Sequence, residues 1–181
     1  MIWYMWAIIA VVVLLIIGLY NSLIRLKNKV KNAWAQIDVQ LKKRFDLIPN
    51  LVDTVKGYAK HEKTVLKEVT EARNMMMKAS DVKGKAAAEN QLAGALKTLF
   101  AVSENYPDLK ASANFLQLQE ELSGMESKIA YARQFYNDMV MRFNTKIQLF
   151  PNNIFAGMLN FKEEQFFETA GKERENVKVK F

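Results

Sequence analysis

Residues 2–20 of the chain read IWYMWAIIAVVVLLIIGLY and carry no charged side chain; the first charged residue is Arg25. At about 1.5 Å rise per residue, roughly 20 apolar residues in a helix match the ~30 Å hydrocarbon core of a bilayer. A cleavable signal peptide would have a positively charged start, a shorter apolar core and a small-residue cleavage site. The stretch therefore predicts a retained transmembrane anchor over residues 1–21.

The flanks of this stretch fit a membrane interface. Aromatic side chains gather at membrane interfaces, and basic side chains are in excess on the cytoplasmic side. The basic residues here follow the apolar stretch, whereas no Lys or Arg precedes it. We therefore expect a single-pass protein of the cell membrane, with its N-terminus outside and its C-terminal domain in the cytoplasm. The candidate span and interface residues are Trp3, Trp6, Tyr20, Arg25, Lys27 and Lys29.

Composition excludes several classes of site. The 181 residues include no Cys and one His, so a disulfide, a thiol nucleophile, a Cys-ligated zinc site and a His-rich metal site within one chain are all excluded. Seven Gly and three Pro, with abundant Ala, Leu, Lys and Glu, predict long helices. The net charge of +7 lies mostly within residues 21–60, beside the apolar stretch, where it suits anionic lipid headgroups. We expect no nucleic-acid binding.

Apolar residues recur at steps of three and four along four stretches, which are residues 30–59, 65–79, 88–106 and 115–150. This spacing places them on one face of a helix in each stretch. Gly, Pro and Ser interrupt the pattern between the stretches, and Pro49 predicts a kink inside the first. The predicted fold is all-α. A single N-terminal transmembrane helix is followed by an antiparallel up-and-down four-helix bundle over residues 22–150, with long first and last helices.

Residues 151–170 form an amphipathic C-terminal segment. Its candidate membrane or subunit contacts are Phe155, Met158, Leu159 and Phe161. The alternative is that the segment folds back over the open end of the bundle, and the preceding turn favours this because it keeps the contact local. Residues 171–181 mix Lys and Glu with few apolar residues, which predicts a flexible tail.

Polar side chains lie close to the apolar stripe of the first bundle helix. They are Asp38, Arg44, Asp46, Asn50 and Asp53. Such groups need partners if they are buried. We expect them to form a buried polar network, or alternatively a docking surface, with internal hydrogen bonding favoured.

No catalytic pattern emerges. Helical bundles that bind two iron ions use inward carboxylates and Glu-x-x-His pairs, but the residue three places before His61 is Tyr58. The carboxylates Glu120, Glu121 and Glu126 fit a solvated helix face. We therefore expect no metal, no cofactor and no enzymatic activity.

Long stretches of the chain resemble one family. These are NAWAQIDVQLKKRFDLIPNLVDTVKGYAKHE (32–62), VTEAR (69–73) and LFAVSENYPDLKASANFLQLQEELSGMESKIAYARQFYN (99–137), with YNSL after the apolar stretch and FPNNIFAGMLNF near the end. They resemble the LemA family over nearly the whole chain. The resemblance implies a bacterial-type single-pass membrane protein with a cytoplasmic four-helix bundle and no assigned reaction or cofactor. One divergent branch takes part in building magnetosome membranes, and family genes often neighbour membrane metalloprotease genes.

These observations predict a membrane-anchored cytoplasmic helical scaffold that self-associates and organises the membrane or envelope proteins. The alternative is an adaptor or regulator of a membrane enzyme such as a metalloprotease. Expected partners are the lipid bilayer, further copies of the chain and other membrane proteins. An anchor favours self-association because confinement to a surface raises the effective concentration of the copies.

Overall fold

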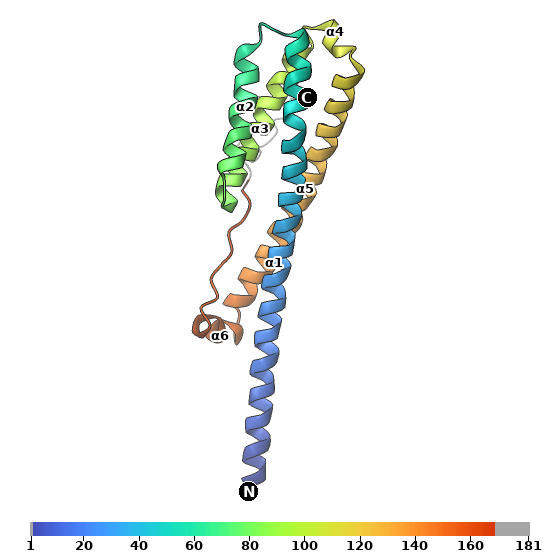
Figure 1. The fold of residues 1–181 in the computed structure, drawn as a ribbon. Helices are drawn as coiled ribbons and strands as arrows, with labels where there is room; N and C mark the ends of the chain where they lie inside the picture. Colours follow the sequence, from blue (N-terminus) through green and yellow to red (C-terminus); the bar gives the residue numbers. More distant parts are fainter. Residues whose placement is uncertain (1, 169–181) are drawn as a thin grey trace, which may run out of the picture. The chain divides into compact units, whose positions relative to one another are not determined.

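All regular structure in residues 2–168, the part of the chain that the computed structural model describes, is helical. Figure 1 shows the six helices. They are α1 (Ile2–Tyr58), α2 (Lys63–Lys78), α3 (Val82–Ser103), α4 (Pro107–Lys110), α5 (Ala113–Gln148) and α6 (Asn152–Met158). The expectation of an all-helical protein with long first and later helices is confirmed. The tail predicted at residues 171–181 lies outside the described residues.

Helix α1 joins the apolar stretch to the amphipathic stretch without a break. Its 57 residues continue through Pro49, although proline cannot donate a backbone hydrogen bond there. Residues Trp3 to Gly18 are exposed, and from Leu23 onward one face becomes buried. The buried positions Val30, Ala33 and Ile37 follow the predicted steps of three and four.

The described chain divides into two compact units. The first unit contains residues 2–36 and 132–166, and the second unit contains residues 37–131 and 167–168. Helices α1 and α5 each contribute one part to the first unit and another to the second.

One apolar core holds the second unit together. It takes side chains from α1, α2, α3, α4 and α5, among them Leu51, Val69, Leu99, Leu109 and Phe115. Burying such side chains is worth about 1.5–3 kcal/mol each. The long helices of this unit alternate in direction along the chain (Figure 1). The break at residues 79–81 contains Ser80 and Asp81, and the break at residues 59–62 follows Gly57, which lies in the last turn of α1.

The connection between α3 and α5 is short and itself partly helical. Residues 107–110 form the single helical turn α4, and α5 already begins at Ala113. Pro107 stands at the start of α4, where its fixed φ suits the first helical position and its missing N–H costs nothing. Leu109 is fully buried, so this turn also contributes to the core.

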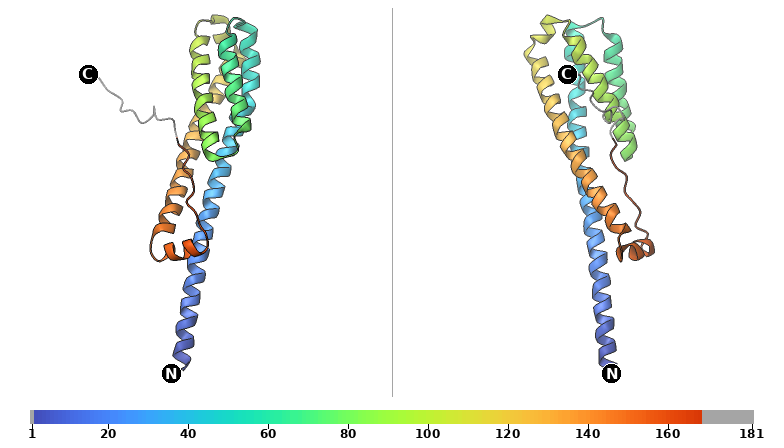
Figure 2. Two further views of the ribbon diagram at one scale, coloured as in Figure 1. Left: turned by 90° about the vertical axis from the view of Figure 1, so that its left-hand side faces the viewer. Right: turned by 180° about the vertical axis from the view of Figure 1, so that it is seen from behind.

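In the first unit, the end of α5 runs antiparallel to α1. The rings of Trp34 and Tyr136 lie 5.5 Å apart, and Lys146 Nζ donates a 2.5 Å hydrogen bond to Ser22 Oγ. Moving forward along α1 from Ser22 to Trp34 corresponds to moving backward along α5 from Lys146 to Tyr136, so the two helices are antiparallel. Figure 2 shows α6 and the end of α5 beside α1, with the N-terminal part of α1 extending beyond them.

Candidate functional site

The N-terminal part of α1 is a candidate membrane span. Among the described residues, α1 alone is long and apolar enough to cross a bilayer, by length and composition. Trp6 is 68% exposed and Leu14 is 67% exposed, so these side chains find no cover within the chain. Such a run of large exposed apolar side chains is costly in water and favourable in lipid.

The predicted interface residues lie at both ends of this run. The ring centroids of Trp3 and Tyr4 lie 3.8 Å apart, and Tyr20 is exposed at the other end. Arg25 and Lys29 are also exposed. Lys27 is half-buried, and its ammonium lies 5.4 Å from the centroid of the Phe161 ring, a cation–π contact.

A buried ion pair lies in the second unit. Arg44 Nη1 of α1 lies 2.5 Å from Glu89 Oε1 of α3, and both side chains are 3% exposed. The other terminal nitrogen of Arg44 lies 3.5 Å from Glu126 Oε2 of α5, whose side chain is mostly exposed. A planar guanidinium suits two carboxylates at once. This group links three helices of the unit.

The other polar residues singled out on α1 are not brought together with Arg44. Asp38 forms an ion pair with Lys85 of α3, and Asp53 forms an exposed pair with Lys56 at 3.7 Å. Asp46 and Asn50 are exposed. The structure thus places Arg44 in a buried ion pair and the other four on or near the surface.

Glu89 is the partner of Arg44 in this ion pair, and it is not among the candidate residues predicted from the sequence. The available signal was its position: it precedes the buried Leu92 by three residues and Leu96 by seven, so helical spacing places it on the apolar face of α3. A charged residue on such a face requires a partner. Sequence spacing alone does not name that partner, because Arg44 lies 45 residues earlier.

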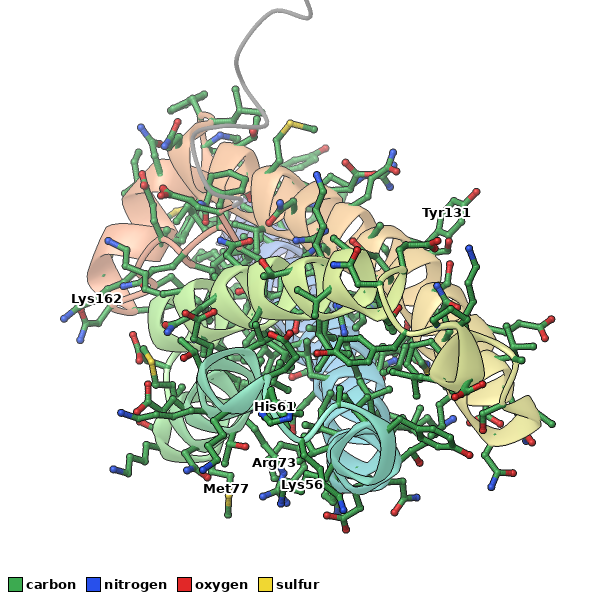
Figure 3. All side chains as sticks on the ribbon, turned by 90° about the horizontal axis from the view of Figure 1, so that it is seen from above. Lys56, His61, Arg73, Met77, Tyr131 and Lys162 are labelled. Atoms are coloured by element: carbon green, nitrogen blue, oxygen red, sulfur yellow. The ribbon has the colours of Figure 1, made fainter. Side chains whose placement is uncertain are left out.

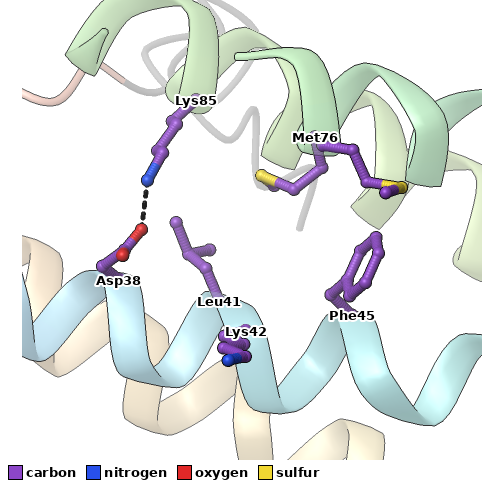
Figure 4. A pocket seen from close by; sticks show the side chains of 7 residues that line it. Asp38, Leu41, Lys42, Phe45, Met76 and Lys85 are labelled. Carbon is purple, nitrogen blue, oxygen red and sulfur yellow. Dashed lines mark hydrogen bonds and ion pairs between the residues drawn. The ribbon is translucent and has the colours of Figure 1, made fainter. Parts of the chain in front are cut away.

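A cavity of about 180 Å³ lies between α1, α2 and α3 of the second unit (Figure 4). Leu41 and Phe45 line it from α1, and Met76 lines it from α2. The Asp38–Lys85 ion pair closes one side in Figure 4. The guanidinium of Arg73 lies 4.2 Å from the Phe45 ring centroid. These contacts tie helices together and place no nucleophile beside a general base.

The described residues hold no group of three or more His, Asp or Glu side chains placed to bind a metal ion. His61 lies in the turn between α1 and α2, where it is exposed (Figure 3). Figure 3 also shows Tyr131 pointing outward from α5, and this side chain is 75% exposed.

Residues 161–165 form a strap, which is hydrogen-bonded to α5 in the first unit. Asn144 Nδ2 donates to the Glu164 carbonyl, and Asn144 Oδ1 accepts from the Glu164 N–H, both at 2.9 Å. Tyr136 Oη donates to the Gln165 carbonyl at 2.8 Å. Burial, and secondarily the negative charge of Glu164, raise the pKa of Tyr136 to about 12, so its phenol stays protonated at neutral pH.

The candidate contacts in the C-terminal segment divide into two groups. The Phe161 ring lies 6.3 Å from the Phe143 ring, and Phe155 is half-buried, so both pack on their own unit. Met158 is 78% exposed and Leu159 is 48% exposed. The segment therefore folds back against the chain in part and leaves an apolar edge uncovered.

Comparison with known proteins identifies the relatives of this chain. The model of the LemA family matches residues 33–181. Protein LemA of Metamycoplasma hominis is 32% identical over 166 residues, covering 89% of this chain and 74% of the relative. Two proteins named as magnetosome proteins are more distant. They are MamQ 2 of Paramagnetospirillum magneticum, at 23% identity, and MamQ of Magnetospirillum gryphiswaldense, at 22%.

The chain spans 64% of the length of both MamQ relatives, and 82% of the chain is covered by each match. The match to Protein LemA extends over most of both chains, and the family model covers most of this one. The resemblance noted in the sequence is therefore confirmed, and the chain belongs to the LemA family.

Proposed function

We propose that the protein is a membrane-anchored cytoplasmic helical scaffold, which self-associates and organises the membrane or envelope proteins. The observation that carries this proposal is the continuity of α1. Its exposed apolar residues 3–18 pass directly into residues that bury one face within the two helical units. The antiparallel four-helix bundle proposed for residues 22–150 is then joined to the bilayer through a helix that contributes to both units.

The proposed orientation places the N-terminus outside the cell and the helical body in the cytoplasm. Arg25 and Lys29 are exposed directly after the span, where they can meet anionic lipid headgroups. A cytoplasmic excess of Lys and Arg beside a span is the general determinant of such an orientation.

One observation supports self-association, and another supports a role at a membrane. Tyr131 of α5 offers a large ring to solvent, and aromatic side chains are enriched where protein surfaces meet. Two distant relatives are named as magnetosome proteins, which fits a role at a membrane-bound structure. An anchor adds to the effect of any weak contact, because copies confined to one surface meet often.

The test is the mass of the full-length protein in mild detergent, measured by light scattering with the bound detergent subtracted, together with electron microscopy. We expect assemblies larger than a monomer. The variant Tyr131→Lys should yield smaller assemblies because it places a charge in the contact, whereas Tyr131→Phe, the matched control, keeps the apolar ring and should behave like the natural chain.

A monomer in both detergent and reconstituted bilayers would overturn self-association. The adaptor of a membrane enzyme such as a metalloprotease would then be the better account, and crosslinking in the native membrane would be the means to identify its partner. Assemblies that are unchanged by Tyr131→Lys would place the contact on another face.

A further inference from the structure

Five large apolar side chains are exposed where α5 ends and α6 follows. We name this group the α5–α6 tip. Phe150 is 79% exposed and Met158 is 78% exposed, both above the 68% of Trp6 in the candidate span. The members are Leu149, Phe150, Ile154, Met158 and Leu159.

The tip is the outer face of an otherwise packed element. Asn152 and Ala156 of α6 are buried one turn apart, whereas Ile154 and Met158, also one turn apart, are exposed. Helix α6 is thus amphipathic, with its inner face held against the first unit and its outer face uncovered. Because the fold already buries one side of α6, the exposed side can contact lipid or another protein.

The register between α1 and α5 gives the position of the tip along α1. Lys146 is hydrogen-bonded to Ser22, and the two helices run antiparallel in the first unit. Extending these two contacts past the end of α5 brings Leu149 level with residues 19–21 of α1, at the C-terminal end of the apolar stretch. Leu19 is half-buried, whereas residues 3–18 are all exposed, as expected where the end of α5 reaches α1.

Basic side chains lie next to the tip on the side away from the apolar stretch. Arg25 and Lys29 of α1 and Lys162 after α6 are exposed, and Lys146 is hydrogen-bonded to Ser22. Glu163, hydrogen-bonded to Gln148, is an exposed carboxylate at the same end of the unit, and these cations outnumber it. Apolar side chains level with the end of a span, followed by Lys and Arg, match the order of hydrocarbon and anionic headgroups across a membrane interface. This charge pattern favours lipid over an apolar protein surface as the occupant.

We propose that the α5–α6 tip inserts into the lipid interface beside α1 and forms a second contact between the protein and the bilayer. The inference rests on the proposed function, because it takes residues 2–20 as the span. With two lipid contacts, the first unit is fixed in its rotation about α1 as well as in its depth. A single transmembrane helix sets the depth but leaves the rotation about its axis free.

The test places a nitroxide spin label at Met158→Cys in the full-length protein, which has no natural cysteine. The protein is reconstituted in vesicles of phosphatidylcholine and phosphatidylglycerol. Collision rates are then measured with oxygen, which concentrates in lipid, and with a water-soluble nickel chelate. Leu15→Cys is the control for the span. Phe135→Cys is the control for an exposed apolar residue in the same unit, 45% exposed and roughly 20 Å along α5 from Leu149.

We expect the oxygen-to-nickel ratio at Met158 to be several-fold higher than at Phe135 and to approach that at Leu15. Phe150→Cys repeats the measurement at a second exposed position. Nickel access at Met158 equal to that at Phe135, with Leu15 protected, would overturn the tip contact and leave the anchor intact.

Two other outcomes are informative. Exclusion of both reagents at Met158 would mean that protein, such as a second copy, covers the tip, and this also overturns the proposal. Nickel access at Leu15 would show that the span itself is not in lipid, and the anchor in the proposed function would then fail together with the tip.

Discussion

Arg44 and Glu89 are two charges removed from water in the second unit, and they lie 2.5 Å apart. Desolvating two charges is expensive, and their attraction repays that cost only when the geometry is good. Such a pair contributes more to the choice of one arrangement of helices than to net stability. We infer that it fixes the register of α1 against α3.

Replacing one member alone should be severe. In Arg44→Met the carboxylate of Glu89 stays buried without the guanidinium, and we expect a loss of about 3–5 kcal/mol in the free energy of unfolding. The double variant Arg44→Met/Glu89→Leu should lose much less, because no charge remains in the core. The measurement is urea unfolding in detergent, followed by circular dichroism.

Lys67→Ala provides the control for this cycle. Lys67 and Glu71 form an exposed pair at 3.6 Å, and its removal should cost less than about 1 kcal/mol. If the single and double variants at Arg44 and Glu89 lost equal stability, the buried charge would not be the source of the loss.

For single residues, the sequence predicts burial or exposure correctly where helical spacing alone determines it. Arg44 falls three residues after Leu41 and four before Ile48, both buried, so the apolar stripe itself includes it. Asp46 comes two residues after Arg44, which places it about 200° further around the helix, at the surface. The ion partner of Arg44 could not be predicted, because it depends on how α3 packs against α1.

At the scale of elements, the four long apolar stretches each became a helix because their spacing and their Gly, Pro and Ser interruptions agree. The strap at residues 161–165 was not predicted. Its hydrogen bonds to Tyr136 and Asn144 join groups that lie 20 to 29 residues apart in the chain, and such pairs leave no periodic signal. The short helix α4 was also missed, because one turn is too short to show a period.

Replacing Pro49 measures what its missing backbone hydrogen bond costs the stability of α1. The helix continues through this residue without an N–H to donate to the carbonyl of Phe45. Pro49→Ala restores that hydrogen bond, so we expect α1 to be stabilised by about 1–3 kcal/mol, after subtracting the extra freedom of the unfolded chain. The measurement is the midpoint of thermal unfolding.

Asp46→Ala, at an exposed position of the same helix, is the matched control and should change stability by less than about 0.5 kcal/mol. A lower midpoint for Pro49→Ala would contradict the prediction and show that the half-buried proline ring packs better than alanine.

For the whole molecule, the direction of insertion is the property that decides which compartment holds the helical body. Because the chain has no cysteine, single cysteines can report it. In intact cells, a membrane-impermeant maleimide should label a cysteine inserted after Met1. It should label Lys60→Cys, exposed between α1 and α2, only after permeabilisation. The physical reason is the basic flank after the candidate span.

Labelling of Lys60→Cys in intact cells would place the helical body outside and reverse the orientation proposed. Reaction of the same cysteine after permeabilisation is the internal control, since it shows that the position is reactive when the reagent can reach it.

The two parts of the first unit emerge from the ribosome at very different times. Ser22 and Lys146, which are hydrogen-bonded there, are 124 residues apart in the chain. At about 5–20 residues per second, translation of that interval takes roughly 6–25 s. The core of the second unit lies within residues 48–122, so its synthesis is finished earlier. Throughout this delay Leu23 and Val30 lack the partners that residues 132–166 provide in their own unit, so this face of nascent α1 stays uncovered for several seconds.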